Sequence, residues 1–167
     1  MTRLHQRPRA RGFSLIETLV AMVVLATGML GIAALYVESL RAGRSAHSRT
    51  LAINLASDMA DRIRANRSGR QFYAVGTAQA GARPTVCGVM RGVPAQNCNA
   101  QQMAQFDIWL WKTMVGNTSS TQYRRMGLPG ATAEIEINTA TQPNSFVIRI
   151  TWSEQNDTFD YTLSTVI

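Results

Sequence analysis

The side chain with the clearest chemical purpose in this sequence is the carboxylate of Glu17, which stands at the mouth of a charge-free apolar segment. That segment runs from Thr18 to Val37, and its twenty residues are enough for one helical pass through a hydrocarbon core of about 30 Å. An ionised acid costs roughly 2.5–3.5 kcal/mol at the centre of a membrane, and less near its surface. An acid in this position needs a partner of opposite charge, so Glu17 is a candidate functional residue.

Three ordinary kinds of N-terminal segment account poorly for this pattern. A secretory signal has about 7–15 apolar residues before a small-residue cleavage site, whereas this run is longer and Ala33-Ala34-Leu35-Tyr36 is a poor site. A lipoprotein needs a cysteine directly after the apolar run, but the first cysteine is Cys87. A plain signal anchor fits the length and gives Glu17 no purpose. Cleavage before the apolar run, between Gly12 and Phe13, remains.

The stretch Gly12-Phe13-Ser14-Leu15-Ile16-Glu17 resembles the type IV prepilin signal. In that signal a short basic leader ends in glycine, and an aromatic residue, an acid and an apolar run follow at the same spacing. The resemblance implies that prepilin peptidase cuts after Gly12 on the cytoplasmic face, and that Phe13 becomes the N-methylated terminus of the mature chain. The ammonium of Phe13 then lies one helical turn from Glu17, so the two charges can neutralise each other. In assembled pili of this family the acid meets the amine of a neighbouring subunit, which makes Glu17 the expected docking residue.

The net charge of +7 belongs largely to the leader. Removing residues 1–12 takes away four arginines, so 13 basic residues stand against 10 acidic ones and the net charge falls to +3. Whole-chain charge is therefore weak support for nucleic-acid binding. Arginine pairs such as Arg124-Arg125, and the arginines at positions 62, 64, 67 and 70, are better explained as solvated faces, so direct nucleic-acid binding is not expected.

A single long helix is expected from Phe13 to about Arg67. At 1.5 Å per residue its roughly 55 residues would extend for about 80 Å. The segment from Glu38 to Arg67 contains no proline, and it carries one apolar stripe with four-residue spacing. The stripe consists of Leu51, Leu55, Met59 and Ile63. The first half of this helix must therefore lie in lipid or in a filament core, and the second half must pack on a head through the stripe.

Charged pairs and a stop signal support the second half of this helix. Pairs of opposite charge at i,i+3 and i,i+4 stabilise a helix by a few tenths of a kcal/mol each. The expected pairs are Glu38–Arg41, Asp58–Arg62 and Asp61–Arg64. Ser68-Gly69 is a plausible C-terminal stop.

The only two cysteines lie in a glycine- and proline-containing region over residues 70–100 that is expected to form loops. In a domain displayed outside the cytoplasm, Cys87 and Cys98 are expected to form one disulfide. Closing a loop of about ten residues would stabilise the fold by roughly 2–3 kcal/mol. No metal site is expected, because His47 is the only histidine after the leader.

The C-terminal part of the chain predicts one short helix followed by a sheet. Met103–Val115 has the pattern of an amphipathic helix with one apolar face. Its expected face consists of Met103, Phe106, Leu110 and Met114. Trp109 and Trp111 cannot both lie on that face, so one is expected in the core and the other at its rim.

Three alternating runs then predict strands at residues 133–138, 146–153 and 159–167, with a hairpin turn at Asn156-Asp157. A long helix packed on an antiparallel meander is an α+β arrangement, and by resemblance it is the type IV pilin fold.

No catalytic group of residues is present in the sequence. There is no Gly-x-Ser-x-Gly motif and no phosphate-binding loop, and the acidic pairs Glu134/Glu136 and Asp157/Asp160 fit solvated faces and turns. We therefore expect a non-enzyme without a cofactor, which is itself the substrate of prepilin peptidase.

Within the family the chain most resembles a PilV-like minor pilin. The resemblance rests on residues 17–31 and 58–66, on the tryptophan-containing helix, and on Ala34 near the place where major pilins carry a proline. It implies a partnership with other minor pilins, the major pilin, the inner-membrane assembly platform and a tip adhesin. Such proteins prime pilus assembly at the tip, and so support twitching motility and adhesion.

The expected organisation is a cleaved leader over residues 1–12, a membrane-spanning helix half over 13–37, an amphipathic half over 38–68 and a head over 69–167. The protein would cross the bacterial inner membrane once with a periplasmic head, and would then enter the pilus. Two alternatives stay open. One is a pseudopilin of a type II secretion system, and the other is a periplasmic binding or enzyme domain on an uncleaved anchor.

Overall fold

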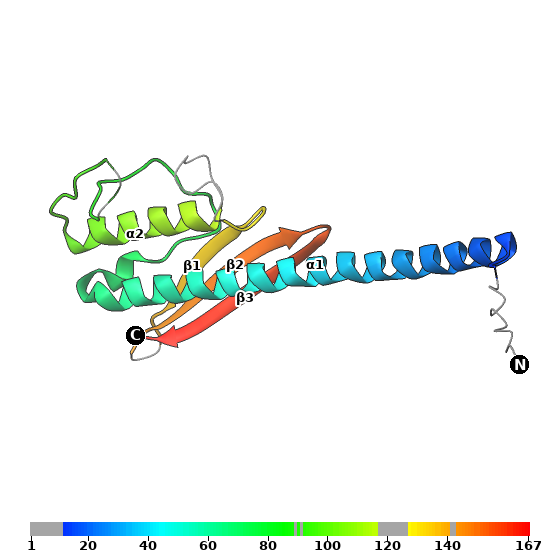
Figure 1. Ribbon diagram of the computed structural model, residues 1–167. Coiled ribbons are helices and arrows are strands. Elements are labelled where there is room, and N and C mark those ends of the chain that lie inside the picture. Colours follow the sequence, from blue (N-terminus) through cyan, green and yellow to red (C-terminus); the bar gives the residue numbers. More distant parts are fainter. Residues whose placement is uncertain (1–11, 89, 91, 117–126, 141–142) are drawn as a thin grey trace, which may run out of the picture. The chain divides into compact units, whose positions relative to one another are not determined.

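The computed structural model describes residues 12–88, 90, 92–116, 127–140 and 143–167. Residues 1–11 of the expected leader and the pair Arg124-Arg125 lie outside these ranges. The chain forms two compact units, one ending at Arg44 and the other spanning Ser45–Ile167. The elements, in chain order, are the α-helix α1 (Leu15–Ala65), the 3₁₀-helix η1 (Arg67–Phe72), the α-helix α2 (Ala100–Val115) and the strands β1 (Thr132–Asn138), β2 (Ser145–Glu154) and β3 (Asp157–Val166) (Figure 1).

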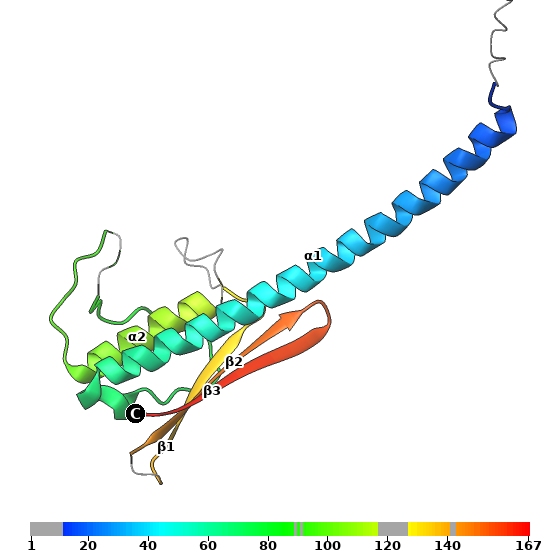
Figure 2. The same cartoon turned by 60° about the horizontal axis from the view of Figure 1, so that its bottom comes forward.

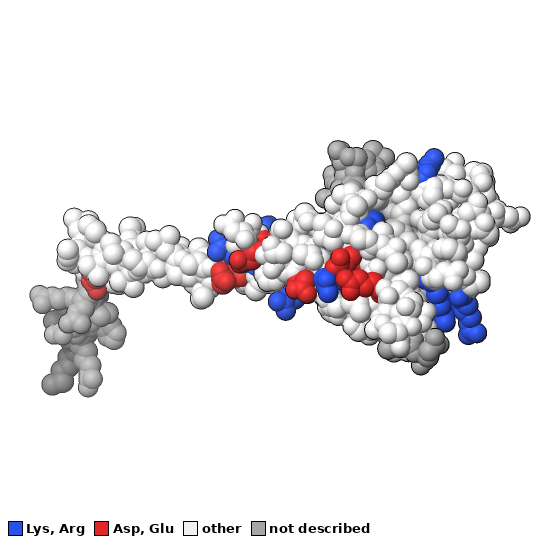
Figure 3. Space-filling view, turned by 180° about the vertical axis from the view of Figure 1, so that it is seen from behind, with Lys and Arg blue, Asp and Glu red and all other residues white. Residues whose placement is uncertain are grey.

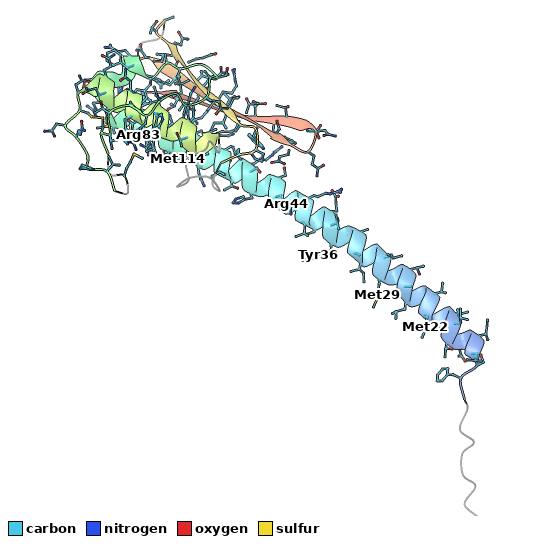
Figure 4. The ribbon with its side chains drawn as sticks, turned by 90° about the horizontal axis from the view of Figure 1, so that it is seen from above. Met22, Met29, Tyr36, Arg44, Arg83 and Met114 are labelled. Atoms are coloured by element: carbon cyan, nitrogen blue, oxygen red, sulfur yellow. A yellow bond between two sulfur atoms is a disulfide. The ribbon has the colours of Figure 1, made fainter. Side chains whose placement is uncertain are left out.

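The first unit contains the N-terminal part of α1, whose apolar side chains are exposed. Met22, Met29 and Tyr36, labelled along the helix in Figure 4, expose 62–71% of their surfaces. Judged by length and composition, α1 is long and apolar enough to cross a membrane. Glu38 and Arg41 form the predicted ion pair, with 3.6 Å between Oε2 and Nη1. An apolar helix with this much exposed surface needs lipid or other helices around it.

In the second unit, the C-terminal part of α1 buries the predicted stripe. Leu55, Met59 and Ile63 are buried, and Leu51 packs partly buried against the same core. A second row beside this stripe consists of the buried alanines Ala52, Ala56 and Ala60. Small side chains at four-residue spacing let neighbouring elements approach the helix backbone closely. The predicted pairs Asp58–Arg62 and Asp61–Arg64 are both formed, at 2.9 and 2.7 Å.

The end of α1 differs from the predicted stop at Ser68-Gly69. The α-helix ends at Ala65, and the chain continues as the 3₁₀-helix η1. Gly69 is buried, and a Cβ atom there would lie 2.5 Å from the carbonyl oxygen of Ala100. The glycine is therefore required for close packing against the start of α2, rather than for ending α1.

Helix α2 begins earlier than predicted because Asn99 caps it. The Asn99 side chain accepts a hydrogen bond from the Gln102 backbone N–H at 2.8 Å, and the Gln102 side chain accepts one from the Asn99 backbone N–H at 3.0 Å. This reciprocal pair is a capping box. The helix consequently starts at Ala100 instead of Met103.

The predicted apolar face of α2 is wrong at two of its four positions. Phe106 is buried and Met114 packs partly buried against the core, but Met103 and Leu110 are only partly buried and lie outside the core cluster. The buried face is instead rotated toward Ala104, Asp107, Trp111, Lys112 and Val115. The reason is that two charged residues on this face are buried with partners, so hydrophobicity alone places the face incorrectly.

The three strands form an antiparallel sheet in the order β1-β2-β3 (Figure 2). The inward row of β2 is fully buried, as the alternating pattern predicted, and it consists of Phe146, Ile148, Ile150 and Trp152. The hairpin turn lies at Gln155-Asn156, one residue before the predicted position, and Glu154 pairs with Asp157. Gln155 takes the required left-handed conformation, with φ 57°. The fold is α+β, as expected.

Candidate functional site

The segment at the start of α1 places Glu17 in the first turn of the helix. Ser14 is the residue before the helix, and its hydroxyl accepts a hydrogen bond from the Glu17 backbone N–H at 3.2 Å. The Ser14 backbone carbonyl also accepts hydrogen bonds from Glu17 and Thr18. Ser14 therefore satisfies an N–H group that would otherwise lack a partner at the helix end.

The carboxylate of Glu17 is left free by this arrangement. In the part of the chain that the structure describes, it accepts no hydrogen bond and forms no ion pair. No other charge lies on the helix before Glu38. The part of α1 before Glu38, which we call the anchor, is therefore almost uniformly uncharged in Figure 3. The position in the first turn also suits an acid, because the helix dipole is positive there. The site can thus hold one negative charge at the end of the charge-free part of α1, where it can pair with a positively charged group of another molecule.

The serine cap carries a testable consequence. Ser14→Ala is expected to remove about 1 kcal/mol from the first turn of α1, because an N-cap hydroxyl is lost. Hydrogen exchange of the full chain in detergent micelles, read by mass spectrometry, would then show faster exchange in the peptide holding residues 15–18. Ser14→Thr is the matched control, since threonine also caps. Equal protection in the wild-type and Ser14→Ala chains would contradict the assigned cap.

A second polar cluster lies inside the head and joins α1, η1 and α2. Arg62 contacts Asp107 at 2.9 Å and Asp58 at 2.9 Å, and the Tyr73 hydroxyl donates to Asp107 at 2.6 Å. Asn66 donates to Tyr73 and to the Ala100 carbonyl. Asp107 is buried, so these hydrogen bonds supply the partners that its charge requires.

Electrostatics in this cluster follow from burial and pairing. Burial alone would lower the pKa of Arg62, but the hydrogen bonds and charges of Asp58 and Asp107 outweigh it and raise that pKa. Burial and the hydrogen bond to Asp107 raise the pKa of Tyr73. Both groups are therefore held in their ordinary protonation states, so the cluster is built for stability rather than for proton transfer.

Asp107→Asn is expected to destabilise the full chain by about 2–3 kcal/mol, because it leaves Arg62 without its buried counter-charge. Asp61→Asn is the matched control, since its ion pair with Arg64 is exposed and should contribute less than about 1 kcal/mol. Urea unfolding in detergent, followed by tryptophan fluorescence, gives both free energies. Equal losses for the two variants would contradict a structural role for the buried cluster.

The other residues that the sequence singled out are the two cysteines, His47, the arginines of α1 and the tryptophans of α2, and those of them with contacts in the structure contact only other groups of the chain itself. Cys87 and Cys98 form the expected disulfide, with Cα atoms 5.6 Å apart. Within the described ranges, no group of three metal-binding side chains occurs, and His47 is exposed on α1. Arg62 and Arg64 are engaged with acidic side chains. Trp111 is buried in the core and Trp109 is only partly buried, which agrees with the prediction that one of the two lies in the core and the other at its rim.

Two family models match this chain. Residues 7–33 match the prokaryotic N-terminal methylation motif, and residues 34–109 match the Tt1218-like family, described as type IV pilin Tt1218. The second match ends within α2, so the sheet lies outside both. No curated protein matches the chain, and no solved structure does.

The matches and the fold lead to the same class. The motif match contains Gly12, Phe13 and Glu17, and a long apolar N-terminal helix with a small three-stranded antiparallel sheet is the type IV pilin fold. Pilins are structural subunits rather than enzymes, and they assemble with other pilins after processing by prepilin peptidase. This chain therefore belongs to the type IV pilins: it carries a Tt1218-like pilin domain behind an N-terminal methylation motif.

Proposed function

We propose that this protein is a minor pilin of a type IV pilus, PilV-like in kind, which helps to prime pilus assembly as part of a tip complex. The observation that carries the proposal is the free carboxylate of Glu17 in the first turn of a charge-free helix, inside a methylation motif. Through its place in the pilus, the protein supports twitching motility and adhesion.

In this proposal prepilin peptidase cuts between Gly12 and Phe13, and Phe13 is then N-methylated. The mature chain keeps residues 13–37 in the membrane, an amphipathic half-helix over 38–68 and a head over 69–167. Before assembly the protein spans the bacterial inner membrane once, with its head in the periplasm. On assembly, Glu17 pairs with the Phe13 amine of a neighbouring subunit, so that neither charge stays alone in the apolar filament core.

A minor rather than a major subunit is supported by the anchor helix. Ala34 stands where major pilins of this family carry a proline, and α1 continues through Gly28, Gly31 and Ala34 without a break. A proline there would remove a backbone hydrogen bond and kink the helix. The proposed partners are other minor pilins, the major pilin, the inner-membrane assembly platform and a tip adhesin.

The proposal is tested by deleting the gene and probing sheared, purified pili with antibody. We expect far fewer surface pili in the deletion strain, and substoichiometric amounts of this protein in wild-type pili. Normal piliation together with a loss of protein secretion would instead identify a pseudopilin of a type II secretion system, which shares the N-terminal motif. Abundance equal to that of the main subunit would exclude a minor role.

A further inference from the structure

The two edges of the sheet differ in whether the chain itself covers them. At the outer edge of β1, the Val75 backbone exchanges two hydrogen bonds with Ile135, at 3.0 and 2.8 Å. At the outer edge of β3, no backbone hydrogen bond joins the strand to another of the described segments. Among the described segments, the chain thus covers the outer edge of β1 at Ile135, whereas the outer edge of β3, the last strand of the sheet in Figure 2, is open.

The open edge lacks most of the features that normally protect an edge strand. Proteins block such edges with charged side chains, above all lysine, and with proline, bulges or very short strands, and β3 has of these only the aspartates Asp157 and Asp160. β3 is ten residues long, contains no lysine, proline or glycine, and pairs with β2 in unbroken register from Asp157 to Val166. Because the two-residue turn makes Glu154 and Asp157 a hydrogen-bonded pair, alternate residues from Thr158 onward direct their N–H and C=O groups away from β2. The outward residues are Thr158, Asp160, Thr162, Ser164 and Val166.

Helix α1 fixes β3 at both ends without covering its edge. Arg49 lies 5.8 Å from the ring centroid of Phe159, and the Arg64 side chain donates to the Thr165 hydroxyl at 2.9 Å. The inward side chains Tyr161 and Leu163 are only partly buried, whereas the inward row of β2 is fully buried. One more strand beside β3 would cover this remaining apolar surface and satisfy the outward backbone groups.

The negative charge of β3 indicates which kind of strand can pair with this edge. Asp157 and Asp160 are exposed, and β3 carries no basic residue. A second copy of β3, in either direction, would bring two more exposed aspartates to this edge and no basic side chain to pair with Asp157 and Asp160. A strand with basic side chains, which a different subunit can supply, would pair with both aspartates.

We infer that the outer edge of β3 docks an extended, basic strand from the head of a different pilin subunit anchored in the same membrane. This inference rests on the proposed function, because the head of another pilin subunit is brought beside this one only during pilus assembly.

The test uses the full-length protein in its native cells, with p-benzoylphenylalanine in place of Ser164 as a photo-cross-linker. Irradiation is expected to join this position to a strand in the head of another pilin, identified by mass spectrometry of the linked peptides. Thr162→Pro, in the same background, removes one outward N–H and should lower the cross-linked fraction about tenfold. Thr162→Val is the matched control, because it keeps the N–H group and should change the fraction less than about twofold.

Asp160→Lys keeps every backbone donor and should weaken the same cross-link, which protects the test if the proline variant fails to fold. A cross-link from Glu136 on β1 is not expected to reach another pilin head in the same way, since Val75 already pairs with the neighbouring Ile135 at that edge. The inference is overturned by a cross-link to a second copy, by a cross-link that neither Thr162→Pro nor Asp160→Lys reduces, or by no cross-link to a pilin. The intact mass of the protein from the same cells separates the failure of this inference from the failure of the proposed function. A mature Phe13 terminus without the cross-link would contradict only the docking of a strand at β3, and would leave the pilin function standing.

Discussion

Glu17→Gln is expected to leave the protein cleaved and resident in the membrane but almost absent from pili. The amide removes the negative charge while keeping the shape of the side chain. The Phe13 ammonium of the neighbouring subunit would then stay unpaired in an apolar core, at a cost of about 2.5–3.5 kcal/mol, or roughly two orders of magnitude in the docking equilibrium.

Immunoblots of sheared pili and of membranes, with the ratio compared between strains, measure this effect. Glu38→Gln is the matched control, because Glu38 ends the same charge-free run but pairs with Arg41 of its own chain. We expect that control to enter pili at the wild-type ratio. A wild-type ratio for Glu17→Gln would remove the proposed docking role of Glu17.

Trp111→Ala is expected to destabilise the full chain by about 3–5 kcal/mol. Trp111 is completely buried, and its indole N–H donates to the Leu55 carbonyl of α1 at 2.9 Å. The substitution therefore removes both a large buried side chain and a hydrogen bond that joins α2 to α1. Urea unfolding in detergent, followed by circular dichroism, gives the free energy.

Trp109→Ala is the matched control for this substitution, because it makes the same change two residues away on the same helix. Trp109 is only partly buried, and it donates to the Gly81 carbonyl at 3.2 Å. We expect a loss of about 1–2 kcal/mol. Similar losses for both variants would contradict the assignment of Trp111 to the core and Trp109 to its rim.

The long helix and the sheet were predictable because each has a simple periodicity. The four-residue spacing of Leu55, Met59 and Ile63 identifies the packed side of α1, and strict alternation identifies the inward row of β2. The predicted strand ends differ from the observed ones by at most two residues. The turn was displaced by one residue because Asn156-Asp157 has the more usual turn composition, while the left-handed position is occupied by Gln155.

The packed face of α2 was not predictable from its own sequence. Asp107 counts as polar in any hydrophobicity pattern, yet it is buried because Arg62 and Tyr73 provide partners from distant parts of the chain. Lys112 is buried on the same face, where it donates to the carbonyls of Gly76 and Ala78. Such partners exist only after the chain has folded, so a local pattern does not contain them.

The cap at Ser14 did have a signal in the sequence. Ser14 and Glu17 stand at the spacing of a capping box, directly before an apolar run. The same serine therefore lies within the processing motif and at the start of the helix that presents Glu17. The residue that begins α1 is thus also the one that places the Glu17 carboxylate in the first turn of that helix.

The intact mass of the protein, taken from membranes and from sheared pili, tests the central claim most directly. The expected mass corresponds to residues 13–167 with a methylated Phe13 amine and a closed Cys87–Cys98 disulfide. That result would show that the cut after Gly12 creates the amine that Glu17 requires. Retention of residues 1–12 in the mature protein would contradict the account, and would point instead to a head on an uncleaved anchor.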